Sequence, residues 1–324
     1  MRAAVCPQHG PPEVVTVEEI DAPPLGAGQA RVQVHAASVN FPDVLIVANE
    51  YQMQVPAPFT PGSELAGVVT EVADDVTAVV PGARVFGSTL VGAFAEEAVV
   101  NASSLTLVPD GVDLAEAAAF GVAHRTAYHV LRSTAGAQAG DEVVVLGAGG
   151  GVGLAAVQLA VALGATVTAV ASSPEKLAAA SAAGATRVVD HRAADLRAAL
   201  KEALPDGADV VVDPVGGALA EPALRVLRYG GRFVTVGYAS GEIPKIPLNL
   251  VLLKGITIVG FQMLTFITNE PDLWKRDEGE LMQLLASGAV RPHLGGRFPL
   301  DETAKALRYV ADGNAIGKVV LDIR

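Results

Sequence analysis

The sequence predicts an α/β protein in which a doubly wound parallel sheet is combined with a β-rich domain. Strand-like and helix-like runs alternate between residues 143 and 261, whereas the region before them contains short β-like runs separated by Pro/Gly turns. A glycine-rich loop, GAGGGVG, joins the first strand of the alternating region to its first helix. Strict alternation of this kind is typical of parallel strands covered by helices on both faces.

The alternating region contains both helix signals and strand signals. Ser173 is a candidate N-cap with Pro174 at the first helical position, and Gly164 and Gly184 stand where C-terminal glycines belong. Strands are expected at EVVVLG, ATVTAV, TRVVD, ADVVVD, GRFVTVG and GITIVGF, and helices around Leu154–Leu163, Pro174–Ala183, Ala194–Leu204 and Ala218–Leu227.

The two ends of the chain predict a second domain. The β-like runs ARVQVHAASV, AGVVTEVA, ARVFGS and FAEEAVV favour a partly open barrel. After Phe261 we expect an amphipathic helix near Glu280–Ser287, the segment RFPL, another helix and a closing strand GKVVLDI that returns to the first domain. The expected domains are therefore 1–122 completed by 265–324, and 123–264.

Composition excludes several classes of function. The formal net charge of −12 over 324 residues argues against a nucleic-acid-binding surface. The single cysteine excludes a disulfide framework, and the polar, Pro-rich start MRAAVCPQHGPPEVV is not a signal peptide. The charge-free stretch between Glu142 and Glu175 raises the alternative of a membrane span, but its glycine punctuation favours strand, helix and strand. We expect a cytoplasmic protein.

The glycine-rich loop resembles a dinucleotide-binding fingerprint in its spacing. After a strand, side-chain-free backbone lets a pyrophosphate approach, and amides at the helix N-terminus face its charge. The alternative is a glycine turn needed only for close helix–strand packing. The predicted cofactor contacts are Ala148, Gly150, Gly151, Val152 and Gly153.

The end of the second strand of this region favours NADPH over NADH. NAD-binding proteins place an acid there, about 20 residues after the loop, to hold the ribose hydroxyls. Here the segment reads AVASSPEK, and Ser172, Ser173, Lys176 and, beyond the third strand, Arg192 are candidate ligands of a 2′-phosphate. The alternative is that Ser173 only caps a helix and Lys176 is only solvated.

Long segments of the chain resemble the medium-chain dehydrogenase/reductase superfamily. They are ASVNFPDVLIVANEYQMQVPAPFTPGSELAGVV, the glycine loop, VDPVGGALAEPALRVLRYGGRFVTVGYASGEIPKIPLNLVLLKG and GNAIGKVVLDI. Within the superfamily the chain is similar to zinc-independent NADPH:quinone oxidoreductases of the zeta-crystallin-like group. The resemblance implies a GroES-like catalytic domain built from both chain ends, an inserted Rossmann domain, and a homodimer or homotetramer.

The same resemblance indicates that the metal site of zinc-using relatives is missing. Those relatives place a metal-ligating His-Glu pair inside the segment that reads TPGSELAG here, so the His position is Ser63 while Glu64 remains. Cys6 stands alone, and the six histidines are scattered. No metal is expected, which removes the Lewis acid used in alcohol oxidation.

The resemblance implies a catalytic segment at VNFPDVLIVANEY. It assigns Asn40 as a polar anchor for the acceptor, Asp43 as the residue that orients it, and Tyr51 as a pocket residue or a donor to the acceptor oxygen. The alternative is structural: Asn40 and Asp43 flank Pro42 in the pattern of a helix cap, and Tyr51 covers core.

The chain also departs from the family pattern. Leu45 replaces a second tyrosine found in some quinone reductases, and His191 replaces a tyrosine associated with the cofactor phosphate. Further cofactor contacts implied by the resemblance are Thr126, Gly237, Tyr238 and Phe261; for Phe261, core packing is an equal alternative.

Hydride transfer from NADPH to a quinone is therefore the expected reaction. Two alternatives remain open. The segment NFPDVL also resembles enoyl-reductase modules of polyketide synthases and related double-bond reductases, which would make the acceptor an enone. A non-catalytic NADPH-binding role is the other. A small-molecule acceptor and a homo-oligomer are expected, with no nucleic acid and no membrane as partners.

Overall fold

The computed structural model describes residues 1–193 and 195–324. The chain divides into two compact units, the first formed by Met1–Val122 and Arg291–Arg324, and the second by Ala123–Val290. The chain leaves the first unit within helix α2, Leu114–His129. Among the described residues, no helix has the length and apolar character needed to cross a bilayer.

The first unit is built around a seven-stranded sheet in the order β14-β15-β3-β4-β5-β7, with β6 paired to β3. Strands from the two chain ends meet in it, because β15 near the C-terminus pairs antiparallel with β3. The return of the closing strand to the first domain, as the sequence predicts, is thus observed. The strands are β3 (Gln29–Val39), β4 (Glu64–Val72), β5 (Arg84–Ser88), β6 (Glu97–Asn101), β7 (Leu105–Leu107), β14 (Leu294–Pro299) and β15 (Lys318–Asp322), with β1 (Arg2–Val5) and β2 (Thr16–Glu19) forming a separate pair.

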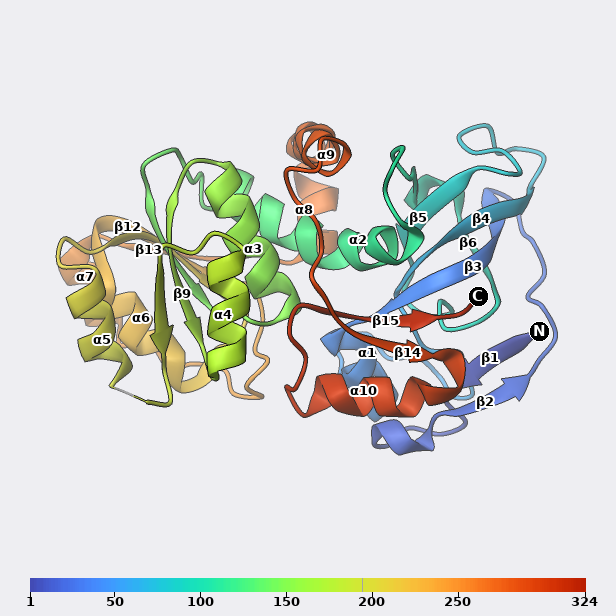
Figure 1. The fold of residues 1–324 in the computed structure, drawn as a ribbon, viewed down its shortest axis with the longest axis horizontal. Coiled ribbons are helices and arrows are strands. Elements are labelled where there is room, and N and C mark those ends of the chain that lie inside the picture. Colours follow the sequence, from blue (N-terminus) through green and yellow to red (C-terminus); the bar gives the residue numbers. More distant parts are fainter. Residues whose placement is uncertain (194) are drawn as a thin grey trace. The chain divides into compact units, whose positions relative to one another are not determined.

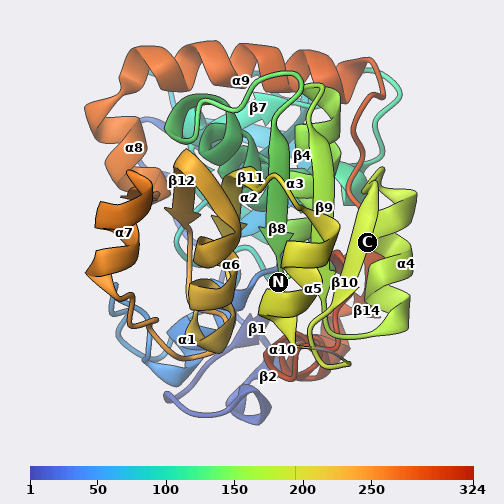
Figure 2. The ribbon, with the colours of Figure 1, turned by 90° about the vertical axis from the view of Figure 1, so that its left-hand side faces the viewer.

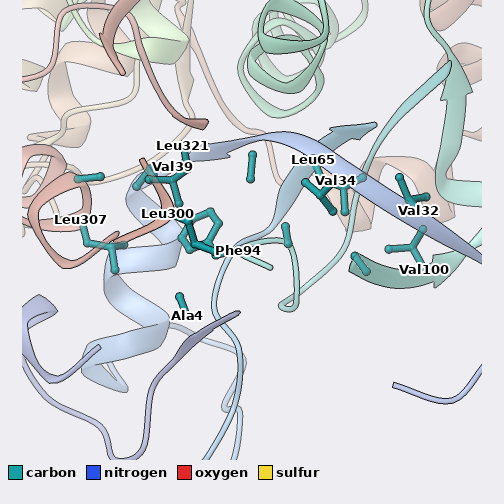
Figure 3. Packing of buried hydrophobic residues seen from close by; sticks show 14 of the residues in the cluster. Ala4, Val32, Val34, Val39, Leu65, Phe94, Val100, Leu300, Leu307 and Leu321 are labelled. Atoms are coloured by element: carbon teal, nitrogen blue, oxygen red, sulfur yellow. The ribbon is translucent and has the colours of Figure 1, made fainter. Parts of the chain in front are cut away.

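Apolar side chains of this sheet pack with two helices, α1 (Phe41–Ala48) and α10 (Thr303–Ala311). Alternate residues of β3 are buried in its first half, as expected for a strand with one face on the core. Figure 3 shows Phe94 beside Leu300 in this core, to which α10 contributes Leu307. The core fixes the strand ends from which the polar residues of this unit project.

The second unit contains a six-stranded sheet in the order β10-β9-β8-β11-β12-β13, and all its strand pairs are parallel. Figure 2 shows β8, β9 and β10 of this sheet side by side, and Figure 1 shows α3 and α4 on one face with α5 and α6 on the other. The predicted α/β fold class is confirmed. The strands are β8 (Glu142–Leu146), β9 (Thr166–Ala171), β10 (Arg187–Asp190), β11 (Ala208–Asp213), β12 (Leu227–Thr235) and β13 (Thr257–Gly260).

The helices of the second unit begin and end near the predicted positions. They are α3 (Gly151–Ala162), α4 (Pro174–Ala182), α5 (Leu196–Ala203) and α6 (Ala220–Val226). Ala194, taken as the start of the third helix in the sequence, lies outside the described residues. Two further helices, α7 (Leu248–Lys254) and α8 (Met263–Asn269), have no counterpart among the predicted elements, and α9 covers Pro271–Ala286, a longer span than the one predicted near Glu280–Ser287.

Residues 265–290 pack in the second unit, whereas the sequence places them with the first. Helix α9 is held there by buried contacts to the end of α2. The Asp277 carboxylate lies 3.0 Å from Nδ1 of His129 and accepts a hydrogen bond from the Ser133 hydroxyl at 2.5 Å. The Trp274 ring stacks on the His129 ring at a centroid distance of 4.4 Å. These pairings join residues about 150 positions apart, so local sequence patterns do not reveal them.

Candidate functional site

Asn40 and Asp43 come together where β3 ends and α1 begins. Asn40 is the N-cap residue of α1, with extended backbone angles, and Pro42 stands in the first turn. The Asn40 backbone N–H donates to Oδ2 of Asp43 at 2.7 Å. This is one half of a capping box, made with Asp in place of the usual Glu or Gln. The helix-capping role that the sequence offered as the alternative for Asn40 and Asp43 is therefore present, and it uses the backbone N–H of Asn40.

The Asn40 side chain makes different contacts, to three residues that the sequence did not single out as site residues. Nδ2 of Asn40 donates to Oε2 of Glu64 at 3.1 Å and to the Ser38 carbonyl at 3.3 Å. The Lys318 ammonium donates to Oδ1 of Asn40 and, at 3.2 Å, to Oε2 of Glu64. We call Asn40, Asp43, Glu64 and Lys318 the buried polar cluster.

All four side chains of the buried polar cluster are removed from water, with exposures of 7%, 1%, 0% and 3% in that order. Glu64 opens β4 and Lys318 opens β15, so the ends of three strands, together with the first turn of α1, supply the cluster. A lysine at the start of the apolar run KVVLD is the signal that marks it in the sequence, since lysine is rarely buried unless paired.

Asp43 is the member of the cluster with a perturbed pKa. Burial raises the pKa of its carboxyl to about 6, against the opposing effects of the Ser63 side chain, the Asn40 backbone and the Lys318 charge. Its Oδ1 atom is buried without a hydrogen-bond partner in the structure. A buried carboxyl that titrates near neutral pH is a group able to hold or release a proton under physiological conditions.

Tyr51 lies beyond the other end of α1. The helix has eight residues, and its C-cap residue, Asn49, adopts a left-handed conformation with φ of 60°. An eight-residue helix is about 12 Å long, so Tyr51 and Asn40 are anchored at opposite ends of one short element. Tyr51 and Leu45 are both half-buried. The structure thus brings Asn40 and Asp43 into contact, and Tyr51 follows the opposite end of α1 along the chain.

In the second unit, the glycine loop leads from β8 into α3. Gly147 has φ of +60°, and Gly150 is the N-cap residue of α3. A Cβ atom on Gly153 would lie 2.1 Å from the Gly147 carbonyl oxygen, so this position requires glycine for packing. Gly150 differs, since a Cβ there would meet its nearest neighbour at 3.5 Å. The loop therefore combines a packing glycine with one that leaves the helix N-terminus open to an anion.

Ala148 and Gly153 are buried, whereas Gly151 and Val152, in the first turn of α3, are half-buried. The backbone N–H of Ala148 donates to the Val170 carbonyl at 2.9 Å, which fixes the loop against β9. These predicted cofactor residues follow one another along the chain at the carboxyl end of β8, the edge at which ligands of open α/β sheets bind.

Basic side chains gather at the carboxyl ends of β9 and β10. The Lys176 stem covers Gly149, because a Cβ on that glycine would lie 2.5 Å from Cβ of Lys176. Burial and then the Arg192 charge lower the pKa of Lys176, and the same two causes lead the lowering of the His191 pKa. The His191 backbone N–H donates to the Ala171 carbonyl at 3.2 Å, next to Ser172.

Ser173 serves as a helix cap, as one of the two sequence interpretations holds. Its hydroxyl accepts a hydrogen bond from the Lys176 backbone N–H at 3.3 Å. The exposed Arg192 donates its backbone N–H to Asp190 at 2.8 Å. Strand β9 ends at Ala171 and is followed by Ser172 and Ser173, without the acid that holds ribose hydroxyls in NAD-binding proteins.

The remaining predicted cofactor residues occupy three places in the second unit. Gly237 and Tyr238 follow β12, and the loop lies against the loop after β11, since Ala239 N–H donates to the Pro214 carbonyl at 3.2 Å. Thr126 is half-buried on α2. Phe261 is buried and packs in an aromatic cluster with Phe266, at a centroid distance of 5.4 Å, and with His129.

The residues of the first unit do not fit a zinc ion at the position used by zinc-dependent relatives. Ser63 stands in place of a histidine ligand, and Glu64 is engaged by the chain itself. Its Oε1 accepts from the Val122 backbone N–H at 2.6 Å, and its Oε2 faces Asn40 and Lys318. Across residues 1–193 and 195–324, no three His, Cys, Asp or Glu side chains are grouped to hold a metal ion.

Comparison with known proteins identifies the class. The family described as "Alcohol dehydrogenase GroES-like domain" matches residues 26–110, and the family described as "Zinc-binding dehydrogenase" matches residues 151–286. The chain is 36% identical to quinone oxidoreductase-like protein 2 of Bos taurus over 100% of its own length and 93% of the relative's. It is 31% identical to the quinone oxidoreductase of Homo sapiens over 99% and 97%.

Solved structures agree with this assignment. The crystal structure of Escherichia coli quinone oxidoreductase complexed with NADPH superimposes with a TM-score of 0.92 at 27% identity, covering 100% of both chains. The fold is thus that of a medium-chain dehydrogenase/reductase with a GroES-like domain and a Rossmann domain, and the protein is an oxidoreductase. Within that superfamily the chain belongs to the quinone oxidoreductase-like family.

Proposed function

We propose that this protein is an NADPH-dependent, metal-independent reductase that transfers a hydride to a quinone. Asn40, Asp43 and Tyr51 are assigned to the acceptor. The glycine loop, Thr126 and the carboxyl ends of the parallel strands are assigned to the cofactor. The observation that carries the choice of cofactor is the set of basic side chains at the ends of β9 and β10, with Ser172 and Ser173, and no acid, at the two positions directly after β9.

The basic set favours a 2′-phosphate over ribose hydroxyls. Lys176 and Arg192 lie close enough for the Arg192 charge to lower the pKa of Lys176. Two cations held together repel one another, and a bound dianion would relieve that repulsion. The Ser172 hydroxyl, directly after β9, is a further candidate donor. The relatives whose structures contain NADPH support the same cofactor.

The chain's own groups would divide the remaining work. The amides at the start of α3 face the pyrophosphate, and the glycines of the loop leave room for it. NADPH, when bound, supplies the hydride. A quinone is already activated by conjugation, so the protein has to position it and stabilise charge on its oxygen, for which one well-placed donor contributes about 2.7–4 kcal/mol.

Metal independence is supported by the way Glu64 is used. A zinc ion needs three or four ligands with free lone pairs. Glu64 shares its carboxylate among three donors of the chain, one of them an ammonium, and Ser63 is a poor zinc ligand. Activation of an alcohol by a Lewis acid is therefore not part of the proposal.

The test is the loss of NADPH absorbance with 1,4-benzoquinone in the presence of a metal chelator. We expect turnover that survives the chelator and exceeds the rate with NADH. Loss of turnover on chelation would contradict metal independence. Turnover restricted to an α,β-unsaturated carbonyl would assign the acceptor to the enone class, and NADPH binding without turnover of either acceptor would assign a binding role.

We also propose that the protein is a homo-oligomer, assembled through strand β13 and helix α7. Strand β13 is an edge of its sheet, and Ile258 on it is 37% exposed. Leu252 of α7 is 82% exposed and Tyr229 of β12 is 84% exposed. An unpaired strand edge flanked by apolar side chains is a template for pairing with another chain.

Light scattering coupled to gel filtration tests this assembly. The wild-type mass should be two or four times 33.0 kDa. Leu252→Asp should shift the mass to that of a monomer, whereas Val80→Asp should leave it unchanged, because Val80 is exposed at 61% in the first unit. A wild-type monomer at micromolar concentration would contradict the proposal.

A further inference from the structure

Both donor hydrogens of the Asn40 side chain are engaged by the protein, which bears on any role of Asn40 as a donor to the acceptor. A primary amide has two donor hydrogens and one acceptor oxygen. Both hydrogens are used, one on Glu64 and one on the Ser38 carbonyl, and the oxygen accepts from Lys318. Asn40 is 7% exposed. Its amide can donate to an acceptor only by giving up one of these hydrogen bonds.

The partners of Asn40 also dictate which way the amide points. The oxygen faces an ammonium and the nitrogen faces a carboxylate and a carbonyl, so the flipped orientation would place like against like on both sides. Glu64 is in turn held by the Val122 backbone N–H at 2.6 Å and by Lys318 at 3.2 Å. The orientation of one amide is thus determined by an ion pair formed between the starts of β4 and β15.

We propose that Lys318 and Glu64 are positioning residues of the reductase: together they hold the Asn40 amide in one orientation, and turnover depends on that orientation. This inference rests on the function proposed above. The Asp43 carboxylate accepts a hydrogen bond from the Asn40 backbone N–H. Asn40 therefore links the ion pair, through its side chain, to the titratable carboxyl of Asp43, through its backbone.

Removing both charges of the ion pair together separates its effect on turnover from its effect on folding. A single change at Lys318 would leave the Glu64 carboxylate buried without its cation, which threatens folding. The E64Q/K318M double variant keeps similar volumes and removes both charges of the ion pair, so neither charge is left buried without the other. We expect it to fold, to retain the wild-type KM for NADPH, and to lose about ten- to a hundredfold in kcat with 1,4-benzoquinone.

The matched control removes a different ion pair from the same strand. Arg297 donates to Asp322 of β15 at 2.6 Å, and both side chains are partly exposed. The R297Q/D322N double variant should keep wild-type kcat and KM. If E64Q/K318M also kept the wild-type kcat, the inference would be overturned.

A second readout does not depend on turnover. In protein labelled with ¹⁵N-asparagine, the two side-chain N–H signals of Asn40 are identified by their loss in Asn40→Ala. Slow hydrogen exchange of these signals in the wild type, with fast exchange in E64Q/K318M, is the expected result. Unchanged exchange in the double variant would overturn the inference. If the wild type lacked quinone turnover, the proposed function would fail, and the exchange measurement would still decide whether the ion pair holds Asn40.

Discussion

The two polar regions of this protein are built on opposite electrostatic principles. In the first unit, the ammonium of Lys318 is matched by the Glu64 carboxylate, and every donor of the Asn40 amide has a partner within the chain. In the second, Lys176 and Arg192 lie near one another, and the charge on Arg192 contributes to the lowered pKa of Lys176. The opposite charges of the first region are thus paired within the chain, whereas we expect the second region to bind an anion.

This contrast teaches which substitutions should act on folding and which on binding. Where two buried groups satisfy each other, removing one of them destabilises the protein, because the other remains buried and unpaired. Partly exposed cations that repel one another contribute little to folding, so removing one should act mainly on a bound anion. Four substitutions test this distinction between effects on folding and effects on binding, and the largest effect is expected at Lys318.

Lys318→Met should be the most destabilising of these changes. It leaves the Glu64 carboxylate fully buried without its cation, and we expect a loss of about 3–5 kcal/mol in the free energy of unfolding by urea. Lys305→Met is the matched control, since Lys305 pairs with Glu302 at the surface and should cost about 1 kcal/mol or less. Equal losses of unfolding free energy at Lys318 and Lys305 would contradict the view that the buried ion pair matters more for folding than an exposed one.

Asp43→Asn should stabilise the protein at neutral pH. The pKa of Asp43 is raised to about 6 in the folded protein, above its ordinary value near 4, so the folded state binds this proton more tightly than the unfolded state. Folding stability therefore falls as pH rises from about 4 to about 6 and then levels off, by about 2–3 kcal/mol.

Urea unfolding at several pH values checks the effect of Asp43. The stability gained by Asp43→Asn should be complete at pH 7.5 and vanish below about pH 4. Asp110→Asn, at an exposed position, should give the same stability as the wild type throughout. A gain that did not depend on pH would show that the Asp43 carboxyl has an ordinary pKa.

Lys176→Glu should act on cofactor choice and not on folding. Replacing the cation by a carboxylate should weaken NADPH about 10- to 100-fold, because charge-assisted hydrogen bonds to a phosphate are worth about 1.5–3 kcal/mol. The affinity for NADH should change little, and Lys201→Glu, on an exposed face of α5, should change neither. Fluorescence titration of both nucleotides measures the ratio. An equal loss of affinity for NADH would show that Lys176 does not bind the 2′-phosphate.

Gly150→Ala should produce the smallest change in folding and still weaken NADPH. The added methyl group fits the chain, with its nearest neighbour at 3.5 Å, but it narrows the approach to the first turn of α3. We expect about a tenfold loss of NADPH affinity with unchanged unfolding. Gly153→Ala, whose methyl group would lie 2.1 Å from the Gly147 carbonyl oxygen, should instead destabilise the unit. Wild-type NADPH affinity in Gly150→Ala would contradict the loop assignment.

The elements of the second unit that surround the glycine loop could be predicted from the sequence. The parallel strands from β8 to β13, the start of α4 at Pro174 and the glycine loop were all predicted, because each is encoded by contiguous residues. The serines and lysine at the end of β9 belong to the same segment as the strand that presents them. A site assembled along one stretch of chain is visible in the sequence.

The buried polar cluster was predicted only in part. Asn40 and Asp43 were singled out from their own segment, but Lys318 lies 278 positions from Asn40 and 254 from Glu64. The placement of α9 has the same cause, since His129 and Asp277 are 148 positions apart. No periodicity or spacing relates residues at such separations, so their pairing is decided when the sheet brings strand ends together.

The sequence by itself therefore determined the fold class, the dinucleotide-type loop and the absence of an acid at the two positions directly after β9, since these depend on local backbone preference and side-chain type. Only the tertiary structure decided that Glu64 is held by Lys318, that the Asn40 amide has no donor to spare, and that the Asp43 carboxyl titrates near neutral pH. The physical reason is that burial and charge pairing are properties of a three-dimensional neighbourhood. In this protein that neighbourhood forms only when β15, at the end of the chain, completes the sheet begun by β3.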